Sequence, residues 1–300
     1  MKKLLVLLLL SCFTLNLTYA KLQYFDNDTS ASNPQSDFIK RFNLRDRLDR
    51  HPYLSLYSGF NRSEYSRVSS SNEFKTQNFA IFCLGFTKIR SEEKAHEDGI
   101  FKITRSGLFI GNYSSKWFSS EKGNLDASMW RFGFNLSDDG WGYKLGPNNY
   151  LFFVFGNSLN WSKINVDGLS GLQQPDSSLL GIFSDQFRFG NTFHSGVSFV
   201  LFNYLAFDFR FERALIYPAH KFWYWLGSYF IEGVSHFLLD EFIEEVFKSS
   251  PKAAPIVNAL LKSSLSYGIY ELRKTKMNWP FNTEAPLLNN NFKFGLSFIF

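Results

Sequence analysis

Three stretches of the chain alternate between apolar and polar residues with a period of two. They are Ser128–Leu136, Phe193–Phe202 and Leu205–Arg213, and each places large apolar side chains at about every second position. Successive side chains of a β-strand point to opposite faces, so this spacing predicts strands with one apolar and one polar face. Less regular alternation predicts four more strands, at Tyr53–Phe60, Gln77–Lys88, Ile100–Asn112 and Asn149–Trp161.

The last ten residues, NFKFGLSFIF, predict an eighth strand at Asn291–Phe300. Turn signals lie at Ser137–Gly140 (SDDG) and at Asn203–Tyr204, which would join two of the best strands in a tight hairpin. If Gly140–Lys144 (GWGYK) formed a strand of its own, the number could reach ten. We therefore expect an all-β antiparallel sheet of about eight strands, with a range of eight to ten.

Longer polar connections are expected at Glu92–Gly99, Tyr113–Asp126 and Ser162–Asp185. The predicted strands are near the roughly 9–11 residues that a tilted membrane strand needs. In a barrel with both chain ends at the periplasmic side, the tight turns would face the periplasm and the long loops would face outward.

Residues 218–290 interrupt the strand pattern before the last strand. Apolar residues recur there at intervals of three and four, first from Phe222 to Leu238 and then from Val257 to Leu272. This period predicts two helices, which most simply pack as an antiparallel hairpin. We interpret the apolar stripes mainly as packing surface. The pattern leaves open whether the hairpin caps the barrel mouth, lies on the outer leaflet or folds into the lumen.

The first 20 residues have the organisation of a secretory signal peptide. Lys2 and Lys3 precede an apolar run, and Thr18-Tyr19-Ala20 offers small residues for cleavage, whereas a lipoprotein site at Cys12 is the alternative. Residues 21–52 would then form a polar periplasmic segment, and residues 53–300 would form the barrel. The mature chain would keep Cys83 alone, which excludes an internal disulfide.

Composition supports a sheet with two unlike faces. Phe, Tyr and Trp make up 19% of the residues, yet beyond the signal peptide no apolar run approaches the roughly 20 residues of a membrane helix. Removing the two N-terminal lysines lowers the net charge from +5 to +3, which is too small to indicate a nucleic-acid partner.

Charged residues in the middle of the predicted strands indicate which face points inward. A barrel of about eight strands has room inside for its own side chains only, so small residues and paired charges suit its interior better than many bulky aromatics. We expect these residues to face the lumen and the alternating aromatics to face lipid: Arg131, Asp208, Arg210, Glu212 and Lys293.

The final strand resembles the C-terminal signature of outer-membrane β-barrel proteins of Gram-negative bacteria. The resemblance is carried by alternating apolar residues and a terminal aromatic: Phe292, Phe294, Leu296, Phe298 and Phe300. It implies an outer-membrane location, recognition of this strand by the barrel-assembly machinery and contact with outer-membrane lipid, but no activity. The alternative is a soluble secreted β-sandwich whose last strand is amphipathic.

Two groups of residues are candidates for chemistry. Glu232, His236, Asp240 and Glu244 are four apart, so on a helix they form one ridge that could bind a metal or share a proton. The alternative is an ordinary solvated face.

His194, Ser198 and Asp208 have the side-chain types of a nucleophile, base and acid, as in outer-membrane enzymes that act on lipids. The alternative is a hydrogen-bonded network of the kind that fills small barrels. No Gly-rich phosphate loop, zinc motif or nucleophile elbow is present, so no cofactor is expected.

These observations predict an outer-membrane barrel that is structural or a narrow passage, with a helical cap or plug, and that is more plausibly non-enzymatic. A membrane enzyme acting on lipid and a surface protein that binds an unknown ligand through its loops and hairpin are the alternatives. A filled polar lumen would favour the structural role, whereas a His–Ser–acid cluster facing lipid would favour the enzyme.

Overall fold

The computed structural model describes residues 50–69, 71–91, 99–117, 123–184 and 186–300. The predicted signal peptide (1–20) and all but the last residues of segment 21–52 lie outside the described residues. The same holds for most of the connection Glu92–Gly99 and for the centre of Tyr113–Asp126. The statements below therefore concern the barrel and its helices.

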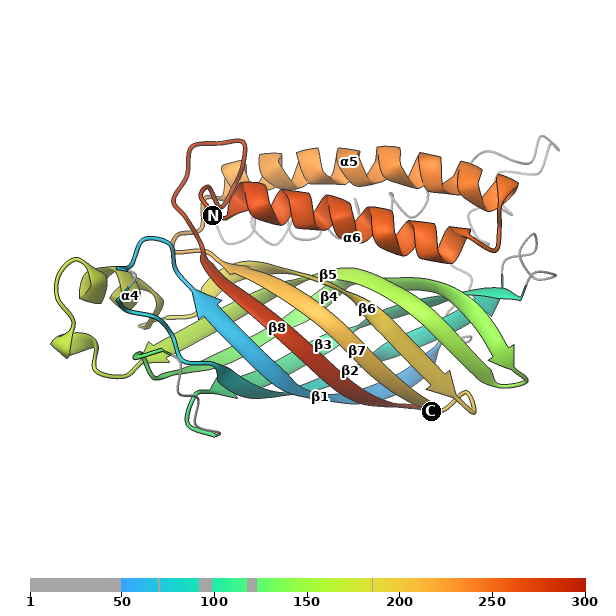
Figure 1. Cartoon of the computed structure of the whole chain (residues 1–300), viewed down its shortest axis with the longest axis horizontal. Coiled ribbons are helices and arrows are strands. Elements are labelled where there is room, and N and C mark those ends of the chain that lie inside the picture. The colour runs from blue at the N-terminus through green and yellow to red at the C-terminus, as the bar shows by residue number, and fades with distance from the viewer. Residues whose placement is uncertain (1–49, 70, 92–98, 118–122, 185) are drawn as a thin grey trace, which may run out of the picture. The chain divides into compact units, whose positions relative to one another are not determined.

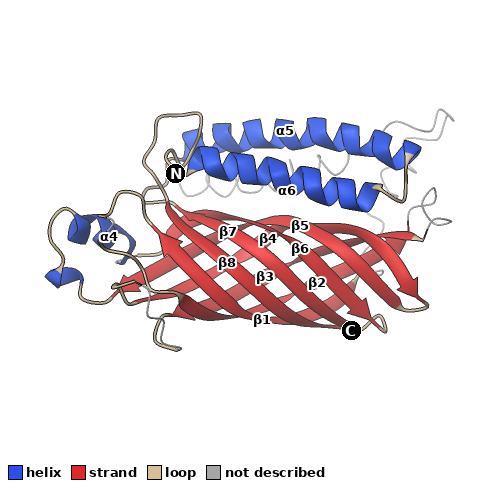
Figure 2. Ribbon diagram, in the orientation of Figure 1, coloured by secondary structure: helices blue, strands red, loops and turns tan. Residues whose placement is uncertain are grey.

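Eight antiparallel strands form a closed barrel, in which each strand pairs with its neighbours in sequence and β1 pairs with β8 (Figure 1, Figure 2). The strands are β1 (His51–Glu64), β2 (Gln77–Ser91), β3 (Ile100–Ser114), β4 (Ala127–Gly146), β5 (Asn149–Val166), β6 (Arg188–Leu201), β7 (Leu205–Ile216) and β8 (Leu287–Ile299). The predicted fold class and the lower strand number are confirmed. Closure satisfies the backbone groups of every strand, which a sheet in hydrocarbon requires.

The seam between β1 and β8 aligns the two ends of the sheet over twelve residue pairs, from Tyr53↔Ile299 to Glu64↔Leu288. The backbone N–H of Phe300 donates to the carbonyl of Pro52 at 2.9 Å, one step beyond the ladder. β1 therefore begins at His51, inside the segment that was expected to precede the barrel, and β8 begins at Leu287 rather than after residue 290.

The turn predicted at Ser137–Gly140 is wrong, because β4 continues through these residues to Gly146. A register shift between Asn135 and Ser137 inserts a β-bulge there, and the tight turn to β5 follows Gly146. The bulge absorbs the turn-forming residues and moves the inward side from odd to even positions. Gly140–Lys144 is consequently part of β4 and not a separate strand.

The connections between the strands differ in length at the two ends of the barrel. We call the end with the β4–β5 and β6–β7 turns and Phe300 the turn end, and the opposite one the loop end. The β5–β6 connection contains a 3₁₀ turn, η2 (Leu169–Gly171), and a helix, α4 (Asp176–Ser184), within the segment Ser162–Asp185 that was expected to be a loop. Asp176 accepts hydrogen bonds from the backbone N–H of Ser69 (3.1 Å) and from the Asn72 amide (2.7 Å), joining two loops.

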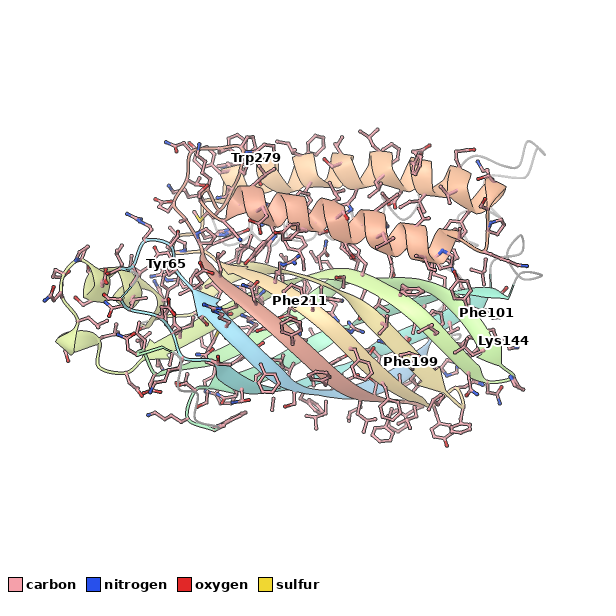
Figure 3. The ribbon with its side chains drawn as sticks, viewed as in Figure 1. Tyr65, Phe101, Lys144, Phe199, Phe211 and Trp279 are labelled. Atoms are coloured by element: carbon pink, nitrogen blue, oxygen red, sulfur yellow. The ribbon has the colours of Figure 1, made fainter. Side chains whose placement is uncertain are left out.

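The outer face of the barrel is apolar. Its outward residues are large and substantially exposed, and include Leu56, Phe60, Phe82, Leu84, Phe86, Leu108, Ile110, Trp130, Phe132, Phe207, Phe209, Phe292, Phe294, Leu296 and Phe298. Figure 3 labels Phe199 and Phe211 on β6 and β7, which belong to the same face. This arrangement is the one predicted from the alternation, with apolar residues outside a closed sheet.

The barrel interior is less purely polar than predicted. Aromatic and aliphatic side chains fill part of it alongside the charges, including Tyr53, Tyr57, Phe79, Ile81, Tyr113, Met129, Phe152 and Val154. Strands β2 and β5 thus carry apolar residues on both faces, which explains why their alternation was irregular. Small residues opposite the rings make room for them: a side chain at Gly295 would collide with the ring of Tyr57, its cross-strand neighbour.

Two helices, α5 (Phe222–Ser249) and α6 (Ala254–Arg273), form an antiparallel hairpin between β7 and β8. The hairpin runs along the outside of the barrel wall, with α6 packed against β4, β5 and β6 (Figure 1). The expectation of a helical cap or plug is therefore wrong. The period of three and four identified the helices but carried no information about what they pack against.

Candidate functional site

The centre of the barrel interior holds a cluster of charges from three strands. Arg105 on β3 donates to the Asp208 carboxylate on β7 at 2.7 Å, and Arg210 on β7 donates to the same Oδ1 at 3.2 Å. Arg210 also donates to Asp138 on β4 at 2.9 Å. Each side chain is at most 5% exposed, so these ion pairs are shielded from water and the partners depend on one another.

Hydroxyl groups complete the coordination of Asp208. Tyr57 on β1 and Ser297 on β8 donate to its Oδ2 at 3.2 and 3.0 Å, and Ser297 also lies 2.5 Å from Ser55. Asp208 therefore accepts hydrogen bonds from groups on β1, β3, β7 and β8. A carboxylate with this many donors ties opposite walls of the barrel together.

A second cluster lies closer to the loop end, around Glu212, four residues after Asp208 on β7. Glu212 on β7 pairs with Arg131 on β4 at 3.0 Å and with Lys293 on β8, and it accepts from the Asn291 amide at 2.5 Å. Arg131 further donates to Ser162 at 3.1 Å and is 1% exposed. The residues expected to face the lumen, Arg131, Asp208, Arg210, Glu212 and Lys293, thus occupy these two clusters, with every charge paired.

The structure does not assemble a catalytic triad from His194, Ser198 and Asp208. Ser198 accepts a hydrogen bond from Arg105 at 2.8 Å, while His194 lies 3.1 Å from Asp138 rather than from Asp208. All three proposed residues are buried in the interior, at most 6% exposed, and none faces lipid. A serine that accepts from a guanidinium and lacks a contact with the histidine is not set up as a nucleophile.

In the ridge Glu232, His236, Asp240 and Glu244, the His236 Nε2 lies 4.0 Å from Glu232 Oε1, but the three carboxylates pair with separate cations. Glu232 pairs with Arg273 at 2.8 Å, Asp240 pairs with Lys262 at 2.7 Å, and Glu244 pairs with Lys248 at 3.3 Å. The His236 ring packs at 5.6 Å from that of Phe155 on β5. Within the described ranges, no group of three or more His, Cys, Asp or Glu side chains is arranged to hold a metal ion.

The hairpin is fastened to the barrel at both of its ends. At the loop end, Trp225 donates to Asn191 on β6 at 3.2 Å, and Tyr270 donates to Asn290 on β8 at 3.1 Å. At the turn end, Tyr143 on β4 donates to the carbonyl of Lys252 at 2.5 Å. Between them the barrel residues Phe155 and Phe193 are buried, although they point outward.

The exposed side of the hairpin is apolar over most of its length. Every exposed residue of α5 from Trp223 to Leu238 is apolar or aromatic, and the exposed residues of α6 from Ile256 to Leu272 carry no charge. Phe230 is 70% exposed and Leu238 is 64% exposed, so the stripe that we interpreted as packing surface is in part an outer surface. Exposed charges on α5 begin at Glu241. Among the described residues, no helix is long and apolar enough to cross a membrane by itself.

Two members of the central cluster escaped sequence reasoning. Arg105 lies in a part of β3 where its outward neighbours, Thr104 and Ser106, are polar and give no apolar alternation, and Asp138 lies in the segment mistaken for a turn. Because Asp138 follows the bulge, its even number places it inside while Arg131 is inside with an odd number. If the sequence analysis had assumed one extra residue in this strand, it would have placed Asp138 and the following glycines on the inner face.

Neither a protein-family model nor a curated protein sequence matches the chain. Among solved structures it is similar to Neisserial surface protein A, with a TM-score of 0.37, 10% identity, and coverage of 83% of this chain and 97% of that one. It is also similar to Ail, the attachment invasion locus protein of Yersinia pestis, with a TM-score of 0.34, 9% identity and coverage of 84% and 99%.

A third match is the transport unit of the autotransporter AIDA-I from Escherichia coli, with a TM-score of 0.27, 9% identity and coverage of 67% and 61%. Because these scores are low, the fold class rests on the chain's own closed sheet. That sheet, eight antiparallel strands with an apolar outer face, is the architecture of outer-membrane β-barrel proteins. The resemblance predicted from the last strand is confirmed at this level.

Proposed function

We propose that the protein is a non-conducting structural barrel of the outer membrane that holds the α5–α6 hairpin within the lipid layer. The observation that carries the first part is the pair of interior clusters around Asp208 and Glu212. Their ion pairs cross the lumen between strands that face each other, so a solute would have to break several buried ion pairs to pass. A narrow passage and an interior enzyme are both less compatible with this packing.

The second part rests on the surface chemistry of the hairpin. The exposed apolar length of α5, from Trp223 to Leu238, is about 24 Å at the rise of an α-helix. The apolar band of an outer-membrane barrel is about 25 Å tall. Exposed charges of α5 start beyond this length, at Glu241, and Lys221 precedes it, so an apolar layer of that thickness would meet uncharged surface only.

Conductance across a planar lipid bilayer tests the barrel's role. The reconstituted wild-type protein should give no single-channel steps, whereas the variant Arg105→Ser/Arg131→Ser, which empties space in both clusters, should give measurable leak if it assembles. Heat-modifiable migration in gels verifies assembly of both proteins. Regular conductance steps from the wild type would refute the structural role and restore the narrow passage.

A further inference from the structure

A groove of about 350 Å³ lies on the outer side of the barrel where α6 meets strands β1, β7 and β8. Its floor is formed by outward residues of the three strands and its wall by α6. The lining combines aromatic rings and three cationic side chains with one carboxylate, Glu271. The residues that matter here are Phe60, Arg62, Phe211, Arg213, Tyr267, Glu271, Lys274 and Phe292. Phe211 is labelled in Figure 3 on the outer face of β7.

Strand register sorts the floor into two rows. Phe60, Phe292 and Phe211 are paired neighbours across β1, β8 and β7 and form an aromatic row. Two residues further along each strand, toward the loop end, Arg62 and Arg213 flank Asn290 in the same way. Alternate residues of a strand are about 7 Å apart, so a cationic row stands directly above an aromatic one.

The two arginines are available to an anion. Arg213 stacks against the rings of Tyr267 (4.4 Å) and Phe211 (4.5 Å), which fixes its guanidinium at the groove. In the part of the chain that the structure describes, neither Arg62 nor Arg213 forms an ion pair with a carboxylate. Lys274, just after α6, also lines the groove and forms an ion pair with Glu271 at 2.8 Å.

We propose that this groove binds an anionic lipid through a phosphate headgroup. The guanidinium groups of Arg62 and Arg213, on strands either side of β8, offer forked N–H donors that match phosphate oxygens. An acyl chain attached to that phosphate would run over the Phe60–Phe292–Phe211 row toward Phe294 and Phe209, the next outward pair. The cationic row lies on the loop-end side, where an apolar layer gives way to headgroups. The inference rests on the proposed membrane placement and not on the closed lumen.

Native mass spectrometry of the detergent-purified full chain measures this binding. The titrant is phosphatidic acid with two 14-carbon chains, and phosphatidylcholine with the same chains and inorganic phosphate are the comparison ligands. The double variant Arg62→Gln/Arg213→Gln should bind phosphatidic acid about tenfold more weakly or worse, because each lost charge-assisted hydrogen bond weakens binding severalfold or more. Heat-modifiable migration confirms that each variant is folded.

A matched control removes a cation elsewhere at the same end of the barrel. Lys163→Gln, on the outer face of β5, should leave the affinity for phosphatidic acid unchanged. Phe292→Ala should weaken phosphatidic acid binding while any affinity for inorganic phosphate stays the same, since this ring lies in the row proposed to contact the acyl chain, whereas Arg213 stacks on Phe211 and Tyr267.

Three results would overturn the proposal. Equal binding of phosphatidylcholine would remove the role of the anionic headgroup, and an equal loss in Lys163→Gln would reduce the effect to general charge. Full competition by inorganic phosphate at comparable concentration would assign the groove to a free anion instead of a lipid. If the barrel conducts ions but these outcomes are absent, the site stands and only the structural role fails.

Discussion

The barrel interior and the helical hairpin both contain buried ion pairs, but the pairs are connected in different ways. Inside the barrel, Asp208 receives donors from Arg105, Arg210, Tyr57 and Ser297, so one carboxylate serves several strands. In the hairpin, Glu232 pairs with Arg273 and Asp240 pairs with Lys262, so each charge has a single ionic partner on the other helix. The charges of the interior form a connected network, whereas those of the hairpin form separate ion pairs between the two helices.

This difference predicts different responses to substitution. Removing one member of the network leaves buried groups on several strands without partners, whereas removing one side of a hairpin ion pair leaves a single buried group, on the neighbouring helix. The interior should therefore control the stability of the whole barrel. The hairpin pairs should control only the attachment of the helices to each other and to the wall.

The largest effect is expected from Asp208→Ala. The change removes the ion-pair partner of Arg105 and leaves Arg210 with Asp138 alone, and breaking buried pairs in this way typically costs about 3–5 kcal/mol. Urea unfolding in detergent micelles, followed by heat-modifiable migration, measures the loss. Asp139→Ala, on the outer side of β4, is the control, and an equal loss in both variants would contradict a network centred on Asp208.

A smaller and local effect is expected from Glu232→Ala. The pair is buried, but Arg273 keeps its hydrogen bond to Ser228 (2.8 Å), so the cost should be about 3 kcal/mol, the low end for breaking a buried pair. Hydrogen exchange should speed up in α5 and α6 while β1–β8 keep their protection. Faster exchange throughout the barrel would mean that the hairpin is part of the barrel's cooperative unit, and the contrast drawn above would be wrong.

Charge placed on the hairpin surface separates a lipid-facing helix from a solvent-facing one. Leu260→Lys on α6 puts an ammonium group in the centre of the exposed apolar face, which should cost about 2–4 kcal/mol if that face meets the bilayer midplane. The yield of assembly into liposomes should fall. Ser249→Lys, beyond the apolar length of α5, is the matched control, and no difference between the two would place the hairpin in water.

The smallest effect concerns pH at the loop end. A hydrogen bond from Lys75, together with one from Ser115, lowers the pKa of Asp126 below its usual value. A lowered folded-state pKa adds stability above the unfolded pKa and loses it as pH falls through the folded one. Acidification below about pH 4 should loosen the contact between the β1–β2 and β3–β4 loops. The change, followed by proteolysis of the loops, should be absent in Asp126→Asn.

Sequence reasoning located the strands because four of them, including the last, repeat a two-residue period with a clear apolar face, and the other four repeat it less regularly. The same period placed Arg131, Asp208, Arg210, Glu212 and Lys293 on the inner face, where the structure has them. Asp138 was missed because a bulge changes the parity of β4 before it, and Arg105 was missed because its outward neighbours Thr104 and Ser106 are polar. The position of the hairpin could not be deduced, since a helical stripe fits a barrel wall, a lipid tail or another helix equally well.

The hairpin makes two sides of the barrel wall different from each other in the plane of a bilayer. It covers the outward faces of β4, β5 and β6, where Phe155 and Phe193 are buried, while β1, β2 and β3 keep Leu56, Leu84 and Leu108 uncovered. Neighbouring molecules that approach laterally would therefore meet a smooth wall of strands on one side and a ridge of helices on the other. Molecules that associate in the membrane would therefore do so in a defined relative orientation.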